Sequence, residues 1–249
     1  MWHIMSPLTQ DIEPLPRAVA FIDGQNLIHD ATREFGYEHL NIDVKKLALS
    51  VCETNRWKLT ETRFYTGVPT LQQNPTWKQF WDKKLFQMRL DGVQTIRSKL
   101  KDRQTQIILY KHIHVTVPNS SAELQSQIDT SPCWVTDRGY YLDHGTVVSQ
   151  TVFTEKGIDV SIAVDAMKYA LESLYDVCLI FSRDSDLSPA VAEIKNIGMK
   201  RLPKFLVATA FPSSQGKDYG IPHADITIRI PKSMYDKCLD PKDYFARKR

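Results

Sequence analysis

Two short apolar segments that end abruptly at acidic turns constrain the fold of this chain more than any other feature. Residues 18–22 read Ala-Val-Ala-Phe-Ile and stop at Asp23, and residues 177–181 read Val-Cys-Leu-Ile-Phe and stop at Ser182. A continuous apolar run is typical of a strand buried on both faces, as in a parallel sheet covered by helices. Ligands of such folds bind at the carboxyl ends of the strands. The sequence therefore predicts an α/β fold with functional turns after these strands.

The rest of the chain alternates between helical and strand-like patterns. We expect helices over residues 43–51, 75–90, 156–174 and 188–197, and strands over residues 60–66, 205–208 and 224–230. Gly198 is predicted to close the last of these helices. The helix over residues 75–90 should bury its aromatic residues and carry cations on its outer face: Lys78, Lys83, Lys84 and Arg89. This alternation predicts a three-layer α/β/α fold with a central, mainly parallel sheet.

Between residues 93 and 153 the pattern changes to short β-like pieces with polar linkers, and Asp137-Arg138-Gly139 is typical of a hairpin turn. We therefore predict one domain over residues 17–230 with a β-rich insertion at about 100–153. An N-terminal extension over 1–16 and a basic C-terminal tail over 231–249 flank it. Neither a signal-peptide pattern nor an apolar run of about 20 residues is present, so we expect a cytoplasmic protein with reduced cysteines.

Acidic residues from three segments are expected to meet at one edge of the sheet. Asp23 follows the first apolar strand, Asp184 and Asp186 follow the second, and Asp159 lies in the first turn of a helix that begins near Lys156. Carboxylates gathered in one place repel each other unless a cation lies among them, and hard oxygen ligands select Mg²⁺ or Mn²⁺. Such an ion can activate water for phosphodiester hydrolysis.

Each of these acids also has a structural alternative. Asp159 or Asp186 could be a helix N-cap, a common role for aspartate at a strand-to-helix junction. Asp23 fits that role less well, because it follows five apolar residues and precedes Gly24, where a ligand can approach the backbone. Asp165 lies six residues after Asp159, so on a straight helix the two point in different directions, and we expect Asp165 to be structural.

Three motifs occur in order along the chain. They are Ala20-Phe21-Ile22-Asp23-Gly24-Gln25-Asn26-Leu27, Lys156-Gly157-Ile158-Asp159-Val160-Ser161-Ile162-Ala163-Val164-Asp165 and Ser182-Arg183-Asp184-Ser185-Asp186-Leu187-Ser188-Pro189. Together they resemble the signature segments of the NYN domain family, whose members are PIN-like ribonucleases. The resemblance spans roughly residues 17–230, with a weaker match in the middle. It implies a PIN-like fold and a metal-dependent endoribonuclease.

By position, the resemblance implies that four acids form the Mg²⁺ or Mn²⁺ site: Asp23, Asp159, Asp184 and Asp186. Asn26 would orient the phosphate or a metal-bound water, with an N-cap as its structural alternative, and Ser182 would lie beside the pocket. The sequence departs from the family in two places. Arg183 stands where the family often has a small or polar residue, and it could grip phosphate or pair with a carboxylate. The insertion is longer than a minimal family member needs.

Basic residues are candidates for holding RNA, because phosphate neutralisation supplies most of the sequence-independent affinity. The substrate-binding residues that we predict are Arg97, Lys99, Lys101, Arg103, Lys156 and Arg183. The formal charge of +3 permits a nucleic-acid partner without requiring one. Aromatic residues of the insertion could stack on unpaired bases or fill a small core beneath it: Trp134, Tyr140 and Tyr141.

The sequence argues strongly against one other enzyme class and excludes a second. Aspartyl-phosphate phosphatases need a second acid two residues after the strand-end aspartate, where this chain has Gln25, and no P-loop motif occurs. A catalytically silent RNA-binding or scaffold protein with the same fold is the alternative to an enzyme. Keeping all four acids without a metal would impose carboxylate repulsion, which favours the enzyme. The choice between RNA and single-stranded DNA stays open, as does a homodimer formed through the insertion.

Overall fold

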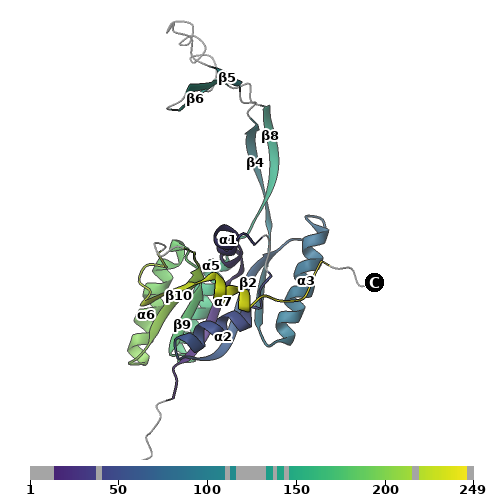
Figure 1. The fold of residues 1–249 in the computed structure, drawn as a ribbon. Coiled ribbons are helices and arrows are strands. Elements are labelled where there is room, and N and C mark those ends of the chain that lie inside the picture. The colour runs from purple at the N-terminus through teal and green to yellow at the C-terminus, as the bar shows by residue number, and fades with distance from the viewer. Residues whose placement is uncertain are drawn as a thin grey trace, which may run out of the picture. The chain divides into compact units, whose positions relative to one another are not determined.

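The computed structural model of the chain describes residues 14–37, 41–109, 113–115, 133–136, 139–142, 146–214 and 219–245, and describes only the backbone within 102–154. The described residues form two compact units, one over residues 101–154 and one from the remainder of the chain (Figure 1). None of the helices described is both long enough and apolar enough to cross a membrane.

The larger unit is built on a six-stranded sheet of order β11-β10-β9-β1-β2-β3, in which every neighbouring pair is parallel. Its strands are β1 (Arg17–Asp23), β2 (Lys58–Val68), β3 (Gln94–Lys99), β9 (Val177–Phe181), β10 (Leu206–Pro212) and β11 (Ile226–Ile230). Its helices are α1 (Gly24–Phe35), α2 (Val44–Thr54), α3 (Pro75–Leu90), α5 (Ile158–Leu171), α6 (Ser188–Arg201) and α7 (Lys232–Lys237), with a 3₁₀ turn η1 (Ser185–Leu187). The predicted fold class is confirmed.

Hydrophobic cores on the two faces of the sheet explain the unbroken apolar strands. Along β1, Ala18, Ala20 and Ile22 pack into a core that includes residues of α1, α2, α3 and α7, whereas Val19 and Phe21 pack into a second core with α5 and α6. Successive side chains of a strand point to opposite faces. Both faces of β1 are therefore covered, and a polar residue is tolerated only where the strand ends, at Asp23.

The structure corrects the predicted end of helix α6. The helix continues to Arg201, so Gly198 lies inside it and does not close it. A Cβ atom at Gly198 would stand 2.3 Å from a ring carbon of Phe205. Glycine is present here because the aromatic ring packs directly on the helix backbone, which sequence pattern alone does not reveal.

Helix α3 has the predicted bounds, but two of its residues are on the unexpected side. Lys84 is fully buried and donates hydrogen bonds to the Asp240 carboxylate at 2.5 Å and to the Ile42 carbonyl oxygen at 2.9 Å. Phe86, expected inside, is exposed. The segment predicted as a basic C-terminal tail supplies Asp240 and the buried residue Tyr235, so its described part packs into the core of the unit.

The smaller unit consists, in its described residues, of antiparallel strands, in agreement with the predicted β-rich insertion. Strand β4 (Lys101–Leu109) pairs with β8 (Thr146–Thr154), and β7 (Gly139–Leu142) pairs with β5 (Ile113–Val115) and β6 (Cys133–Thr136). Strand β3, by contrast, belongs to the main sheet although its sequence resembled the pieces of the insertion. The turn residues 137–138 and the side chains of Trp134, Tyr140 and Tyr141 lie outside the described residues, as do positions 1–13 of the predicted N-terminal extension.

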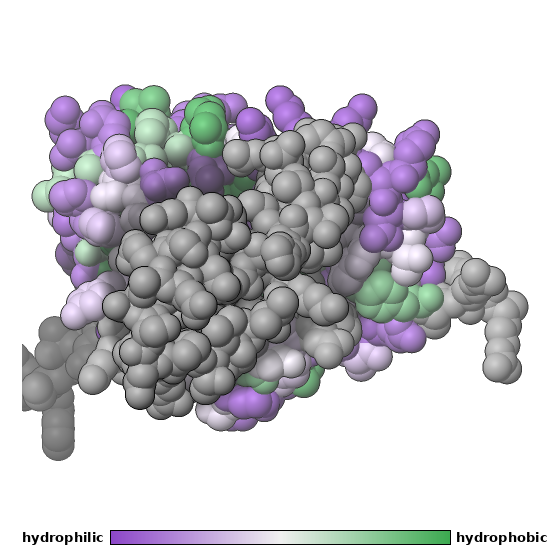
Figure 2. Space-filling view, turned by 90° about the horizontal axis from the view of Figure 1, so that it is seen from above, coloured by the Kyte–Doolittle hydropathy of each residue, from purple (hydrophilic) through white to green (hydrophobic). Residues whose placement is uncertain are grey.

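Most of the described surface in the view from above is hydrophilic, with hydrophobic patches that are small and separate (Figure 2). The large exposed apolar residues of the larger unit are distributed over several helices and include Phe86, Leu90, Val160, Val164 and Met199. Apolar residues scattered in this way are ordinary for a protein surface. They do not identify a binding site by themselves.

Candidate active site

A pocket of about 120 Å³ lies where β1 and β9 end. Its lining is mostly polar and consists of Asp23, Gln25, Asn26, Glu155, Gly157, Ile158, Asp159 and Asp184. Three of the four predicted acids therefore share one pocket although the sequence separates them widely. Asp186 is not part of the lining, but its negative charge acts on Asp159 and helps to raise the pKa of that carboxyl.

Asp23 is buried at the junction of β1 and α1 and is held by Asn26. Its carboxylate accepts hydrogen bonds from the Asn26 backbone N–H at 3.0 Å and from the Asn26 side-chain amide at 2.6 Å. Asp23 is thus the N-cap of α1, and the alternative in which Asn26 is the cap is wrong. Burial raises the pKa of Asp23, the Asn26 hydrogen bonds lower it, and the charge of Asp184 raises it further. The effect of burial is larger than that of the hydrogen bonds, so the pKa of Asp23 is raised overall.

Asp159 lies in the first turn of α5 and is not its N-cap. The cap position is Gly157, whose φ of 83° is left-handed, and no side chain caps this helix end. Burial raises the pKa of Asp159, and the charges of Asp23, Asp184 and Asp186 add to that effect. Asp159 is therefore close enough to the other three acids for their charges to act on it.

The turn after β9 is held by its own side chains. Asp184 caps η1 by accepting a hydrogen bond from the backbone N–H of Asp186 at 2.9 Å. The backbone N–H of Asp184 donates in turn to the hydroxyl oxygen of Ser182 at 3.1 Å. Ser182 is buried, and its carbonyl oxygen accepts a hydrogen bond from the hydroxyl of Thr209 on β10. The N-cap alternative for Asp186 is wrong, because Asp184 fills that role.

Glu155 is an acid of the pocket that the sequence analysis missed. One of its carboxylate oxygens, Oε2, accepts a hydrogen bond from the backbone N–H of Gly67 at 2.7 Å. Burial, helped by the charges of Asp23 and Asp159, raises the pKa of Glu155 to about 7. The available signal was an acid directly before the Lys156-Gly157 motif, but Glu155 follows no apolar strand and so drew no attention.

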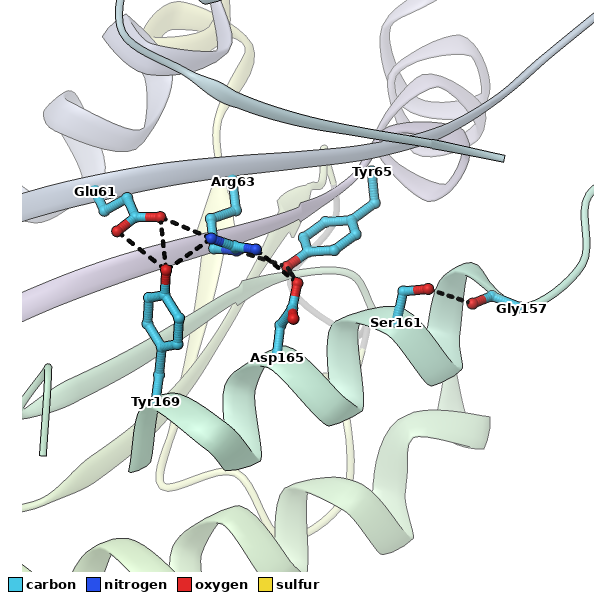
Figure 3. A network of polar contacts seen from close by, with 7 residues as sticks. All are labelled: Glu61, Arg63, Tyr65, Gly157, Ser161, Asp165 and Tyr169. Atoms are coloured by element: carbon cyan, nitrogen blue, oxygen red, sulfur yellow. Dashed lines mark hydrogen bonds and ion pairs between the residues drawn. The ribbon is translucent and has the colours of Figure 1, made fainter. Parts of the chain in front are cut away.

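A polar network on the face of β2 fixes helix α5 (Figure 3). The Asp165 carboxylate accepts hydrogen bonds from the Arg63 guanidinium at 2.7 Å and from the Tyr65 hydroxyl at 2.8 Å. Tyr169, one turn further along α5, contacts both Arg63 and Glu61. Asp165 has the structural role expected from its helical position. Because β2 pairs with β1 in a register that places Tyr65 opposite Asp23, the network positions α5, and with it Asp159, relative to β1.

The predicted substrate-binding residues are divided between the two units. Arg183 donates from Nε to the buried carboxylate of Asp30 at 3.0 Å. Of the two roles predicted for Arg183, the structure therefore shows the ion pair with a carboxylate. Arg97 and Lys99 are exposed on β3, and Lys156 is exposed beside the pocket residue Gly157. The two remaining residues belong to the smaller unit: Lys101, which is exposed, and Arg103, whose side chain lies outside the described residues.

Comparison with known families identifies the chain. The family model of the NYN domain matches residues 80–215, which is more than half of the 249 residues. The chain belongs to the NYN domain family. The match covers the motifs around Asp159 and Asp184 and begins after the one around Asp23, so the place of Asp23 in the site depends on the geometry above.

NYN proteins are nuclease-like members of the PIN-like group and usually use divalent metals. No curated protein matches this chain. Among solved structures, a protein of unknown function from Vibrio parahaemolyticus is similar, with 15% sequence identity and a TM-score of 0.45 over 88% of this chain and 94% of that chain. This likeness is too distant to add to the argument.

The pocket offers the ligands that Mg²⁺ and Mn²⁺ prefer, because its acids and Asn26 all present oxygen atoms. Within the described ranges, no three acidic, histidine or cysteine side chains lie close enough together to hold an ion as they stand. Repulsion between the carboxylates is a physical reason for this spacing. An ion held in this pocket would need the carboxylates closer together than they stand here.

A second cavity, of about 710 Å³, is larger but lies at the opposite edge of the sheet. It is lined by Pro14, Leu15, Pro16, Arg56, Asp176, Leu202, Pro203 and Lys204. Its one acid, Asp176, is paired with Arg17 at 3.0 Å. The smaller pocket is therefore the candidate active site of this NYN domain, because it gathers the acids and lies where the strands end.

Proposed function

We propose that this NYN protein is a metal-dependent endoribonuclease that hydrolyses RNA phosphodiester bonds with a Mg²⁺ or Mn²⁺ ion. Asp23, Asp159, Asp184 and Asp186 would hold the ion. The observation that carries the proposal is that acids from three distant segments line or act on one small pocket, where neighbouring negative charges help to raise the pKa of Asp23 and of Asp159. Such mutual repulsion is costly in a protein without a bound cation and useful in one that binds it.

The ion would activate a water molecule and neutralise charge on the phosphate. Residues of the chain would orient the metal ligands and bind the substrate. Asn26 holds Asp23 through two hydrogen bonds, which presents the carboxylate in a fixed direction. Lys156, exposed beside the pocket, would bind a phosphate of the substrate. Arg183 would add a second cation if it exchanged Asp30 for phosphate.

Further along the substrate, four basic residues would contact the RNA backbone: Arg97, Lys99, Lys101 and Arg103. Contacts of this kind act through charge neutralisation and counterion release. The affinity for RNA should therefore fall steeply as the salt concentration rises. A protein that binds RNA through these residues without cutting it is the alternative function, and the spacing of the acids is the observation that favours it.

The test is an RNA cleavage assay with labelled single-stranded and structured RNA, in Mg²⁺, in Mn²⁺ and in chelator. Asp23→Asn keeps the size of the side chain and removes its charge, and we expect it to abolish cleavage. Asp243→Asn, on an exposed residue outside the pocket, is the control. Cleavage that persists in chelator or in Asp23→Asn would refute the proposal, and binding without cleavage under every condition would favour the alternative.

A further inference from the structure

We propose that Glu155 is a fifth acidic ligand of the metal site, anchored to the backbone through one carboxylate oxygen and free to bind the ion through the other. This proposal rests on the proposed metal-dependent function. It concerns a residue that lies directly before the motif starting at Lys156, within the residues 80–215 that the NYN family model matches.

The Glu155 carboxylate packs against the backbone of strand β2 at Gly67. Its Oε2 atom accepts the Gly67 backbone N–H at 2.7 Å, and Gly67 lies next to the carboxyl end of β2, at the sheet edge where the pocket opens. A Cβ atom at position 67 would stand 2.7 Å from Oε2 of Glu155 and 2.4 Å from Cδ2 of Leu100. Only a residue without a side chain lets the carboxylate approach the strand this closely.

Glu155 lies among the acids that are proposed to bind the metal ion. It lines the pocket together with Asp23, Asp159 and Asp184. The charges of Asp23 and Asp159 act on it directly. The one hydrogen bond described for its side chain uses Oε2, which leaves Oε1 available to the pocket. A carboxylate bound in this way is oriented before the ion arrives, as supporting hydrogen bonds orient the ligands of metal sites.

A purely structural role does not account for the charge of Glu155. The Gly67 N–H needs an acceptor, and a neutral glutamine would supply one without repelling Asp23 and Asp159. A fourth carboxylate in a partly buried pocket destabilises the protein without metal. Its charge is useful only when a cation is bound, a compromise between stability and function that is common at active sites.

The test compares Glu155→Gln with the wild type in two measurements. Glutamine keeps the length of the side chain and an oxygen for Gly67 N–H, and it removes the charge. In chelator, we expect the thermal midpoint of Glu155→Gln to be higher than that of the wild type. In a Mn²⁺ titration followed by electron paramagnetic resonance, we expect its affinity to be at least about tenfold weaker. Glu53→Gln, on an exposed residue of α2, should change neither measurement.

The outcomes separate this proposal from the proposed function. If Asp23→Asn loses Mn²⁺ binding but Glu155→Gln binds as the wild type does, Glu155 is not a ligand and the proposed function stands. If the wild type itself binds no Mn²⁺, the metal mechanism fails as a whole. Should Glu155→Gln not fold, Gly67→Ala applies the same test, because the added methyl displaces the carboxylate and keeps every acid. Unchanged Mn²⁺ affinity in that variant would also overturn the proposal.

Discussion

The side-chain amide of Asn26 donates a 2.6 Å hydrogen bond to the carboxylate of Asp23, in addition to the bond from its own backbone N–H. Asp23 is 3% exposed, so solvent contributes little to holding it. Asn26 therefore has two effects on this acid: it fixes the direction of the carboxylate and it stabilises the charged form against burial.

Replacing Asn26 with alanine should weaken metal binding and slow cleavage. The backbone bond survives in this variant and the amide bond is lost, so Asp23 becomes more mobile and harder to ionise. We expect a roughly 10- to 100-fold loss of Mn²⁺ affinity, the scale found when a group supporting a metal ligand is removed. A calorimetric Mn²⁺ titration measures it. Asn26→Asp should be worse than alanine, because it places a second carboxylate against Asp23, and an equal or tighter affinity would contradict this reading.

The stability of the metal-free protein should fall as the pH rises through the range in which Glu155 ionises. Its pKa is raised from 4.5 to about 7 in the folded protein, so the protonated form favours folding. That contribution is complete below pH 4.5 and is lost as the pH rises to about 7. Asp23 and Asp159 shift in the same direction.

Chemical denaturation in chelator at several pH values measures this dependence. The decline between pH 4.5 and 7 should be smaller in Glu155→Gln, which has no carboxyl to ionise, and saturating Mn²⁺ should offset it in the wild type. A wild-type stability that increases with pH over this interval, in a protein free of metal, would show that the carboxylates do not repel each other in the folded state.

Asp165→Asn should act on the active site from a distance. The variant leaves the Arg63 guanidinium with weaker partners at a half-buried position, although Glu61 still faces it at 2.9 Å. We expect a loss of about 1–3 kcal/mol in unfolding free energy and a weaker Mn²⁺ affinity, because α5 holds Asp159. Urea denaturation and a Mn²⁺ titration measure the two effects. If stability falls while Mn²⁺ affinity stays at the wild-type value, the network stabilises the fold without positioning the site.

Gly198→Ala should destabilise the protein although alanine is the better helix former. Intrinsic propensity favours alanine by about 1 kcal/mol, but the new methyl would overlap the Phe205 ring, whose nearest atom lies 2.3 Å away. Overpacking of this kind costs about 1–3 kcal/mol, so the net change should be a loss. Thermal denaturation measures it, and the double variant with Phe205→Leu should recover part of the loss. A stabilised Gly198→Ala would mean that Gly198 is exposed to solvent in the folded protein.

Local pattern was sufficient for most of the fold and for part of the site. The bounds of α3 and the strands that end at Asp23 and Phe181 follow from neighbours in the sequence. Where the prediction was wrong, the deciding contact came from far away. Lys84 is buried because Asp240 and the Ile42 carbonyl oxygen meet it there, and its own helix gives no sign of either partner.

The amino-acid sequence by itself determined that the chain forms an α/β fold and that acids follow its central strands, because burial of a strand on both faces leaves polar residues only at its ends. Tertiary structure alone decided that Glu155 joins these acids. The Glu155 carboxylate fits against the backbone of Gly67, 88 positions away, because glycine has no side chain. The residues around Glu155 in the sequence show no pattern that indicates this space.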